Sequence, residues 1–292
     1  MKRSITYKLS IFAFLLPALF LFIAILIAPI IMSGYYSFFD WGGPGKAAEF
    51  IGLGNYRELF TSKSISFMKA LGNSLLLAAL SVCVQLPLAL LLALKLGKKI
   101  RGERAFLSIY FIPVLISTVV IGQLWLKIYN PEYGVLNIAL RAVGLKDWAR
   151  IWLGDKKTAL WACFVPILWQ YVGYHMLLMY AGVKGVPTEL REAAMLDGAT
   201  EGQVNRYIVI PYIKPILKVS VIFAVTGSLK SFDLIYVLTN GGPFHSTEVP
   251  STLMINMLSL RNRYGMGSTI AVMLILLCFA FALLINLAFK ED

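Results

Sequence analysis

Residues 70–94 read ALGNSLLLAALSVCVQLPLALLLAL and contain no Asp, Glu, Lys or Arg. A helix of about 20 mostly apolar residues spans the hydrocarbon core of a bilayer. The run is long enough for this, and its many leucines and alanines are strong helix formers. The stretch therefore predicts a transmembrane helix, and it places the chain among the membrane proteins.

Five more segments have the same apolar character. With residues 70–94 they give six predicted spans, the others at about 11–32, 105–126, 158–183, 216–238 and 268–289. We therefore predict an all-α integral membrane protein with six transmembrane helices. We expect residues 1–292 to form a single transmembrane domain with one long polar loop at 184–215.

The composition favours the same class and excludes a soluble globule. Of the 292 residues, 59% are hydrophobic and 14% are charged, and the mean hydropathy is +0.75, whereas soluble domains carry about a quarter charged residues. The net charge of +12 does not indicate a nucleic-acid partner. The cations form short clusters between apolar runs, and no basic stripe alternates with aromatic residues.

No residue pattern indicates a metal site, a disulfide framework or a catalytic centre. Cys83, Cys163 and Cys278 fall inside apolar runs, where cysteine behaves as a small hydrophobic residue. His175 and His245 are the only histidines. No catalytic triad or carboxylate pair stands out, so we expect neither a metal nor an enzymatic role.

The distribution of basic residues predicts the orientation. They gather before the first span, between the second and third, and between the fourth and fifth: Lys2, Arg3, Lys8, Lys95, Lys98, Lys99, Arg101, Arg104, Lys184, Arg191, Arg206, Lys214 and Lys218. These segments share one side of a six-span protein, and the positive-inside rule assigns that side to the cytoplasm. Both termini are therefore expected inside. The loop at 131–157 departs from the rule with Arg141, Lys146, Arg150, Lys156 and Lys157.

The first span is predicted to be a retained signal anchor. Lys2, Arg3 and Lys8 precede it, as basic residues precede a signal peptide. Its apolar run is too long for a signal peptide, however, and no small-x-small cleavage site follows promptly.

Aromatic residues gather around the loop between the third and fourth spans: Trp125, Tyr129, Trp148, Trp152 and Trp161. Such residues commonly form a belt at the membrane–water interface. The alternative is that some of them face a sugar or a docked partner.

The loop at 184–215 contains a helix-prone polar segment, Glu192-Ala193-Ala194-Met195-Leu196-Asp197-Gly198. Thr188 is predicted to cap the helix at its start, and Gly198 ends it or allows a close backbone approach. A helix lying on lipid headgroups needs large apolar residues and basic flanks. The small residues here instead favour docking into a groove, with Glu192 and Asp197 as anionic contacts.

This segment resembles the EAA motif of the permeases of binding-protein-dependent ABC importers. Glu192-Ala193-Ala194 is followed after three residues by Gly198, and after nine more by Ile208-x-Ile210-Pro211. The usual ending is Ile-x-Leu-Pro, from which Ile210 departs conservatively. A second matching block runs from Phe232 to Pro243, FDLIYVLTNGGP. Over nearly its whole length the chain is similar to the MalF-type sugar permeases, which include lactose, glycerol-phosphate and oligosaccharide permeases.

The resemblance implies a fold, partners and a place for the ATPase. It implies the type I permease fold of ABC importers, in a bacterial plasma membrane. It also implies a heterodimer with a second homologous permease, two ATPase subunits that bind ATP and Mg, an extracellular solute-binding protein, and a sugar, with an oligosaccharide expected. The EAA segment would be the coupling helix in a cleft of the ATPase, formed by Glu192, Ala193, Ala194, Leu196, Asp197 and Gly198.

The resemblance also places candidate sugar contacts. Alignment on the two motifs puts Gln170, Tyr171, Tyr174, Gly227, Ser228 and Ser231 at pocket positions of the family. The MalF-type pattern has Asn where Ser228 and Ser231 stand, so the ligand need not be maltose. In this family only one of the two permeases holds the sugar in some members, so the partner is an alternative place for the pocket.

Lys230 and Asp233 lie three residues apart inside the predicted fifth span. Each charge costs roughly 2.5–3.5 kcal/mol at the centre of a lipid-facing helix. We therefore expect them to pair, to face the interior, or to border a water-filled path.

The chain contains no Gly-x4-Gly-Lys-[Ser/Thr] loop, so we expect ATP hydrolysis on separate subunits and no nucleotide cofactor in this chain. The alternative function is an ion-coupled secondary transporter. That class favours internal repeats and intramembrane carboxylates, of which only Asp233 is a candidate.

Overall fold

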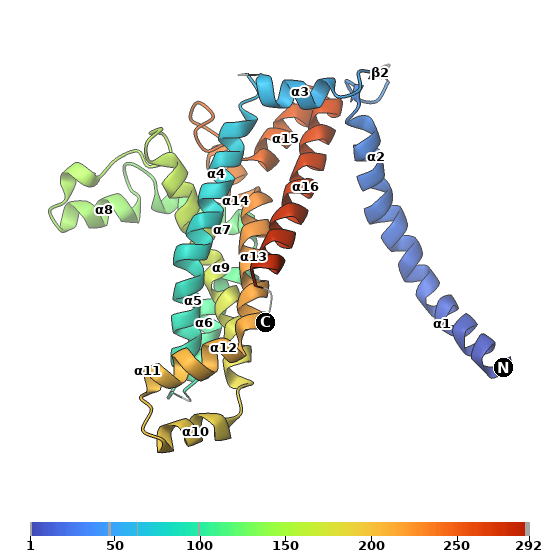
Figure 1. Ribbon diagram of the computed structural model, residues 1–292. Helices are drawn as coiled ribbons and strands as arrows, with labels where there is room; N and C mark the ends of the chain where they lie inside the picture. The colour runs from blue at the N-terminus through green and yellow to red at the C-terminus, as the bar shows by residue number, and fades with distance from the viewer. Residues whose placement is uncertain (1, 46–47, 63, 99, 290–292) are drawn as a thin grey trace. The chain divides into compact units, whose positions relative to one another are not determined.

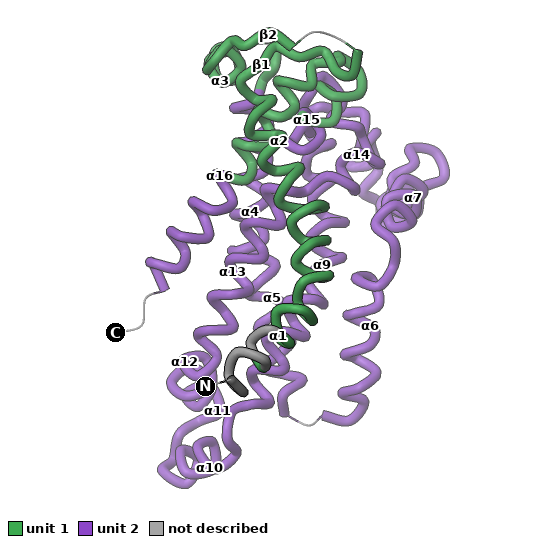
Figure 2. The backbone as a smooth tube through the Cα atoms, turned by 90° about the vertical axis from the view of Figure 1, so that its right-hand side faces the viewer, with its two compact units in different colours: residues 1–66, 254–275 green, residues 67–253, 276–292 purple. Residues whose placement is uncertain are grey.

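The structure is a computed structural model that describes residues 2–45, 48–62, 64–98 and 100–289. Lys99, one of the predicted cytoplasmic cations, lies outside the described residues. The chain divides into two compact units, one of residues 1–66 with 254–275 and one of residues 67–253 with 276–292 (Figure 2). The divisions at 253/254 and 275/276 fall within the helices α15 (Pro250–Ser259) and α16 (Tyr264–Ala288).

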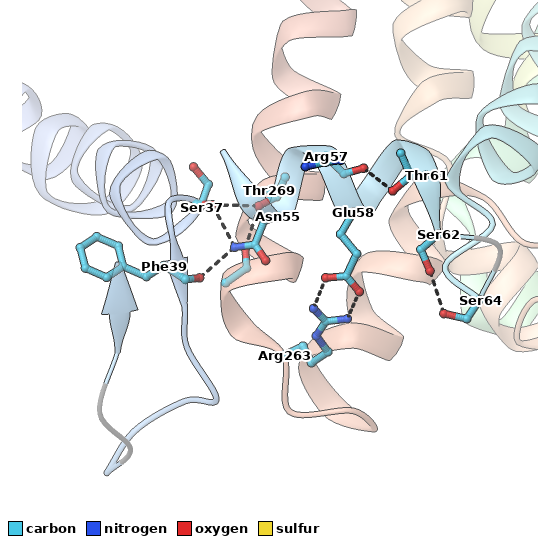
Figure 3. A network of polar contacts seen from close by, with 11 residues as sticks. Ser37, Phe39, Asn55, Arg57, Glu58, Thr61, Ser62, Ser64, Arg263 and Thr269 are labelled. Atoms are coloured by element: carbon cyan, nitrogen blue, oxygen red, sulfur yellow. Dashed lines mark hydrogen bonds and ion pairs between the residues drawn. The ribbon is translucent and has the colours of Figure 1, made fainter. Parts of the chain in front are cut away.

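The first unit begins with one long apolar helix and closes with polar contacts. Its elements are α1 (Lys2–Leu21), the π turn η1 (Phe22–Ile27), α2 (Ala28–Tyr36), β1 (Phe39–Asp40), β2 (Glu49–Phe50) and α3 (Gly54–Thr61), with the end of α15 and the start of α16. The two strands pair antiparallel, with Phe39 opposite Phe50. The carboxylate of Glu58 and the guanidinium of Arg263 form two hydrogen bonds of 2.7 and 2.5 Å (Figure 3).

The second unit is a helix bundle. Its elements are α4 (Phe67–Leu80), η2 (Ser81–Gln85), α5 (Leu86–Leu96), α6 (Glu103–Leu115), α7 (Thr118–Ile128), α8 (Val135–Ala142), η3 (Lys146–Trp148), α9 (Ala159–Lys184), α10 (Thr188–Leu196), α11 (Glu201–Val204), η4 (Asn205–Val209), α12 (Ile210–Tyr212), α13 (Lys214–Leu229) and α14 (Asp233–Thr239), with the start of α15 and the end of α16 (Figure 1). The helix α9 lies at its centre and packs against α5, α6, α13 and α14.

The close contact between α6 and α9 requires a glycine. A Cβ atom on Gly173 would lie 1.8 Å from the carbonyl oxygen of Tyr110. Small residues of this kind let two helix backbones approach, as they do in membrane bundles. Residue 173 thereby fixes the position of the α9 turn that carries Tyr174.

In the part of the chain that the structure describes, each of the three π turns stands shortly before a proline. The turns η1, η2 and η4 end two residues before Pro29, Pro87 and Pro211, respectively. Proline has no backbone N–H, and its ring crowds the carbonyl four residues earlier. Widening the helix to i→i+5 hydrogen bonds accommodates both effects without breaking the span. The sequence therefore shows where these long helices depart from ideal geometry.

Five helical stretches of the described residues are long and apolar enough to cross a membrane: Ser10–Tyr36, Phe67–Leu96, Ala159–Lys184, Lys214–Thr239 and Tyr264–Ala288. The predicted third span, 105–126, differs from the structure. It is divided into α6 and α7, which are bent by 96°. The helix α6 ends at Leu115, and Ile116 and Ser117 connect it to α7 with ψ values of 139° and 130°, far from the helical range. The described residues contain a sixth membrane span only if α6 and α7 are counted together as one span.

The predicted fifth span is also interrupted. The sequence predicts one helix over 216–238, whereas α13 ends at Leu229 and α14 begins at Asp233. Phe232 has φ −139° and ψ −64°, outside the helical region. Lys230 therefore lies in the break between two helices, and Asp233 is the first residue of the second, rather than both lying inside one helix.

Candidate functional site

A cavity of about 340 Å³ opens in the second unit beside the break between α13 and α14. Small-molecule sites in proteins have volumes of roughly 300–1,000 Å³, so the cavity is large enough for a small ligand. Its walls come from η2, α7, α9, α13 and α14. The lining residues are Ser81, Gln85, Thr118, Ile167, Tyr171, Tyr174, His175, Phe223, Ala224, Thr226, Gly227, Ser228, Lys230, Ser231, Phe232, Asp233 and Leu234.

Five of the six predicted sugar contacts line this one cavity. Tyr171 and Tyr174 come from neighbouring turns of α9, and Gly227, Ser228 and Ser231 come from the end of α13 and the break after it. The two tyrosines are more than 50 positions before the other three residues in the sequence, and packing of α13 on α9 brings the two groups together.

The two tyrosines differ in their surroundings. Tyr171 is 39% exposed, whereas Tyr174 is half-buried, and its ring lies 6.3 Å from the ring of Phe223. Tyr174 is therefore held by packing, with its ring part of a fixed aromatic wall.

Gln170, the sixth predicted contact, lies behind the wall instead of lining the cavity. It is 1% exposed, and its amide nitrogen lies 3.4 Å from the hydroxyl of Thr118, which does line the cavity. Among the described residues, its amide oxygen is buried without a hydrogen-bond partner. The structure thus places Gln170 where it orients a lining residue.

The cavity also contains both charges of the interrupted span. Lys230 and Asp233 are exposed and line it, and no ion pair joins these two described residues. Of the three expected arrangements, the structure shows the border of a hollow rather than a pair. The break in the helix allows this, because it leaves both side chains on the cavity wall.

Sequence reasoning missed the polar residues contributed by η2. The hydroxyls of Ser81 and Ser228 lie 3.3 Å apart, and the amide of Gln85 donates to the carbonyl oxygen of Leu168 over 2.9 Å. Ser81 and Gln85 are four residues apart in a span without charges. Polar side chains at helical spacing in such a span are themselves a signal for an interior-facing path.

The predicted coupling segment forms the exposed helix α10. Glu192, Ala193, Leu196, Asp197 and Gly198 are exposed, with Leu196 exposed to 88%, and Ala194 is half-buried. The helix begins at Thr188 itself, with Pro187 as the preceding cap residue, so the predicted capping by Thr188 is wrong. The capping box of this region lies further on, where the side chains of Thr200 and Gln203 begin α11.

Gly198 closes α10 in a left-handed conformation. Its φ is +84°, and a Cβ atom added to it would have no other atom within 4 Å. The N–H of Ala199 donates to the carbonyl of Ala194, and that of Gly198 donates to the carbonyl of Met195. These two bonds form the Schellman motif, for which glycine is favoured. Within this chain, glycine is needed here for its backbone conformation, since no atom of the chain lies close to it.

Contacts of α10 and of the turn after it hold them against the bundle. The guanidinium of Arg191 donates to the carbonyl of Val183 at the end of α9 over 2.5 Å. Ala194 and Ala199 pack against the core cluster that contains Val186 and Val204. These contacts join α10 and the turn after it to the end of α9 and to the core beside it.

Known proteins similar to this chain are components of membrane transport systems. Residues 85–290 match the family described as "Binding-protein-dependent transport system inner membrane component". A probable ABC transporter permease protein of Pyrococcus horikoshii is 38% identical over 91% of this chain and 91% of its own length. A multiple sugar-binding transport system permease protein of Streptococcus mutans is 30% identical, over 94% of this chain and 93% of its own length. The crystal structure of a bacterial ABC transporter involved in the import of the acidic polysaccharide alginate has the same fold, with a TM-score of 0.85, 23% identity, and coverage of 98% of this chain and 97% of that chain.

Proposed function

This chain belongs to the family of binding-protein-dependent transport system inner membrane components, and on that premise we propose that it conducts a sugar of oligosaccharide size through an ABC importer. It is a multi-pass membrane permease. The relative of Pyrococcus horikoshii, by its name a probable ABC transporter permease, argues against the alternative of an ion-coupled secondary transporter.

The cavity beside the α13–α14 break is the observation that carries the sugar assignment. Tyr171 and Tyr174 offer aromatic rings on which a sugar ring stacks, and Ser228 and Ser231 offer hydroxyl groups for its hydroxyls. A largely apolar pocket with a few well-placed polar groups is the usual form of a small-ligand site. The Streptococcus mutans relative, by its name a sugar system permease, supports the same substrate class.

ATP hydrolysis is assigned to two separate ATPase subunits, which would bind ATP and Mg. This chain has no nucleotide-binding loop, and it exposes α10 at the opposite end of the second unit from the α14–α15 connection (Figure 1). The small residues Ala193 and Ala194 and the exposed Leu196 suit a cleft on such a subunit. A second permease and an extracellular solute-binding protein complete the complex, and both termini lie in the cytoplasm.

The mechanism is alternating access. A ligand shifts such an equilibrium only through different affinities for the two states. Closure of the ATPase subunits moves α10, and the contacts of Arg191 and Ala194 pass that movement to α9. Because α9 and α13 both line the cavity, a change in their packing alters how the cavity holds the sugar.

The test is sugar uptake by the complete importer in proteoliposomes, with Tyr174→Ala compared with wild type. We expect uptake at low sugar concentration to fall about tenfold, which corresponds to ~1.4 kcal/mol of lost binding. Basal ATP hydrolysis, measured without sugar, should persist, because it takes place on the ATPase subunits and Tyr174 is outside α10.

The matched control is Tyr133→Ala, which removes an exposed tyrosine outside the cavity. It should transport like wild type. Unchanged uptake by Tyr174→Ala across a panel of oligosaccharides would remove the cavity from the transport path.

A further inference from the structure

The connection between α7 and α9, residues 129–158, is a hairpin organised by one buried side chain. Asn137 is 1% exposed. Its amide nitrogen donates to the carbonyls of Pro131 and Arg150, and its amide oxygen accepts from the N–H of Arg150 and the indole N–H of Trp152. These four hydrogen bonds fix which face of α8 points into the hairpin and which points out.

The outward face of α8 is apolar. Val135 is 68% exposed and Ile138 is 51% exposed, and Ala139 and Ala142 on the same face are exposed as well. These positions follow the i, i+3, i+4, i+7 spacing of one helical face. Asn137 occupies the opposite, buried face. A surface helix of a water-soluble domain has the reverse arrangement, so this face is built for an apolar neighbour.

The apolar surface continues beyond α8. Val143, Leu145, Trp148 and Ile151 are 71%, 47%, 61% and 59% exposed. At the start of α9, Trp161 and Val165 are 51% and 49% exposed. Exposed apolar side chains therefore occur both in this connection and at the start of α9, which is long and apolar enough to cross a membrane, with the exposed Lys156 and Lys157 between them.

The same hairpin is basic. Residues 129–158 contain five basic residues, Arg141, Lys146, Arg150, Lys156 and Lys157, against three acidic ones, Glu132, Asp147 and Asp155. These cations are the ones that depart from the positive-inside rule. An apolar face with basic residues beside it is the signature of a segment that lies in the interface of an anionic membrane.

We propose that the outward face of α8, with Trp148, lies in the headgroup region of the bilayer, where the neighbouring cations bind the phosphates of anionic phospholipids. Figure 1 shows α8 running across the direction of α4 and α5, beyond the side of the bundle, as a helix in the plane of the interface would. The exposed Trp161 and Val165 at the start of α9, a helix long enough to cross a membrane, favour lipid over a water-borne partner. This inference depends neither on the sugar nor on which side of the membrane the hairpin occupies.

The experiment measures the depth of Trp148 in nanodiscs that contain the full-length chain with the subunits that purify with it. The fluorescence of Trp148 is taken as the difference between wild type and Trp148→Phe. Phosphatidylglycerol brominated near the carbonyl end of its acyl chain should lower this signal by about half, because an interfacial tryptophan lies at that depth. Acrylamide dissolved in the buffer should quench the Trp148 fluorescence weakly. Phosphatidylcholine brominated at the same position should quench it less than the brominated phosphatidylglycerol does.

Trp152 is the matched control on the same hairpin. Its indole N–H is bound to Asn137, so its signal, isolated with Trp152→Phe, should respond less to the brominated lipid than that of Trp148. Strong quenching of Trp148 by acrylamide would show a hairpin in water and overturn the proposal. Shielding of Trp148 from both quenchers would show that another protein covers the face, and would overturn it equally.

Discussion

Gly173 lies so close to Tyr110 that a Cβ atom at residue 173 would be 1.8 Å from the Tyr110 carbonyl oxygen. The contact joins α6 to α9 one residue before Tyr174. Because the obstructing atom belongs to the backbone, no side-chain rotation relieves the clash. The geometry of the cavity wall therefore depends on the absence of one methyl group.

Gly173→Ala should destabilise the second unit by about 1–3 kcal/mol, the usual cost of overpacking. The measurement is the thermal unfolding temperature of the purified protein. It is obtained from the amount of folded protein that size-exclusion chromatography recovers after heating to each temperature. Gly72→Ala in α4 is the matched control, because no atom lies within 4 Å of the added Cβ. That variant should unfold at or slightly above the wild-type temperature, since alanine favours helix over glycine by ~1 kcal/mol. Equal stability of the two variants would contradict the close packing of α6 on α9.

Gly198→Val should separate ATP hydrolysis from sugar uptake in the complete importer. A β-branched residue at φ +84° costs roughly 1–2 kcal/mol or more, so the end of α10 would change its course. ATP hydrolysis should persist while uptake falls, as measured together in proteoliposomes.

Two variants control for this prediction. Gly202→Val also enlarges an exposed glycine with open space around it, but within the helix α11, and it should leave uptake intact. Gly198→Asn should restore part of the coupling, because asparagine tolerates the left-handed conformation. Wild-type uptake by Gly198→Val would argue against a coupling role for α10.

The ion pair between Glu58 and Arg263 should make the first unit sensitive to acid. The hydrogen bonds from Arg263 lower the pKa of Glu58, with burial acting against them and the charge of Arg263 adding to the decrease. A carboxylate whose pKa is lower in the folded state stabilises the fold above its unfolded pKa of about 4.3. This contribution is lost as the pH falls through the lower, folded value.

Arg263→Gln tests that dependence. At pH 7 the variant should be slightly less stable, by about 1 kcal/mol or less because both side chains are about a third exposed. The difference from wild type should shrink as the pH drops below the unfolded pKa of glutamate. Arg261→Gln removes an exposed cation nearby and is the control. A wild-type–variant difference that is independent of pH would exclude Glu58 as the titrating partner.

Asn137→Ala should loosen the hairpin of residues 129–158. It removes the partner of the Trp152 indole and of three backbone groups, and each buried group left unpaired costs about 1–3 kcal/mol. Trypsin should then cleave the native protein faster at Arg141, Lys146 or Arg150. Asn130→Ala is the comparison, since Asn130 caps only the local turn at Glu132 and Tyr133, and its cleavage rate should stay near wild type.

Much of the fold follows from sequence alone, because the signals are local. Apolar runs such as 70–94 predict the membrane-spanning helices, and the all-α membrane fold is confirmed. The permease fold, implied by the family resemblance, is confirmed as well. The motif from Glu192 to Gly198 identified the family, which the match over residues 85–290 shows. The Schellman end of α10 follows from Gly198, whose missing Cβ makes the left-handed conformation cheap.

The cavity was decided by tertiary structure. The bend between α6 and α7 and the break from Lys230 to Phe232 depend on packing, because apolar residues on both sides read as continuous spans. Gln170 lies behind the cavity wall, and Ser81 lies beside Ser228. Both positions depend on how distant helices pack, and the spacing of residues within one segment does not determine that packing. Hydrophobicity thus determined which residues enter the membrane, whereas contacts between distant helices decided which polar groups meet there.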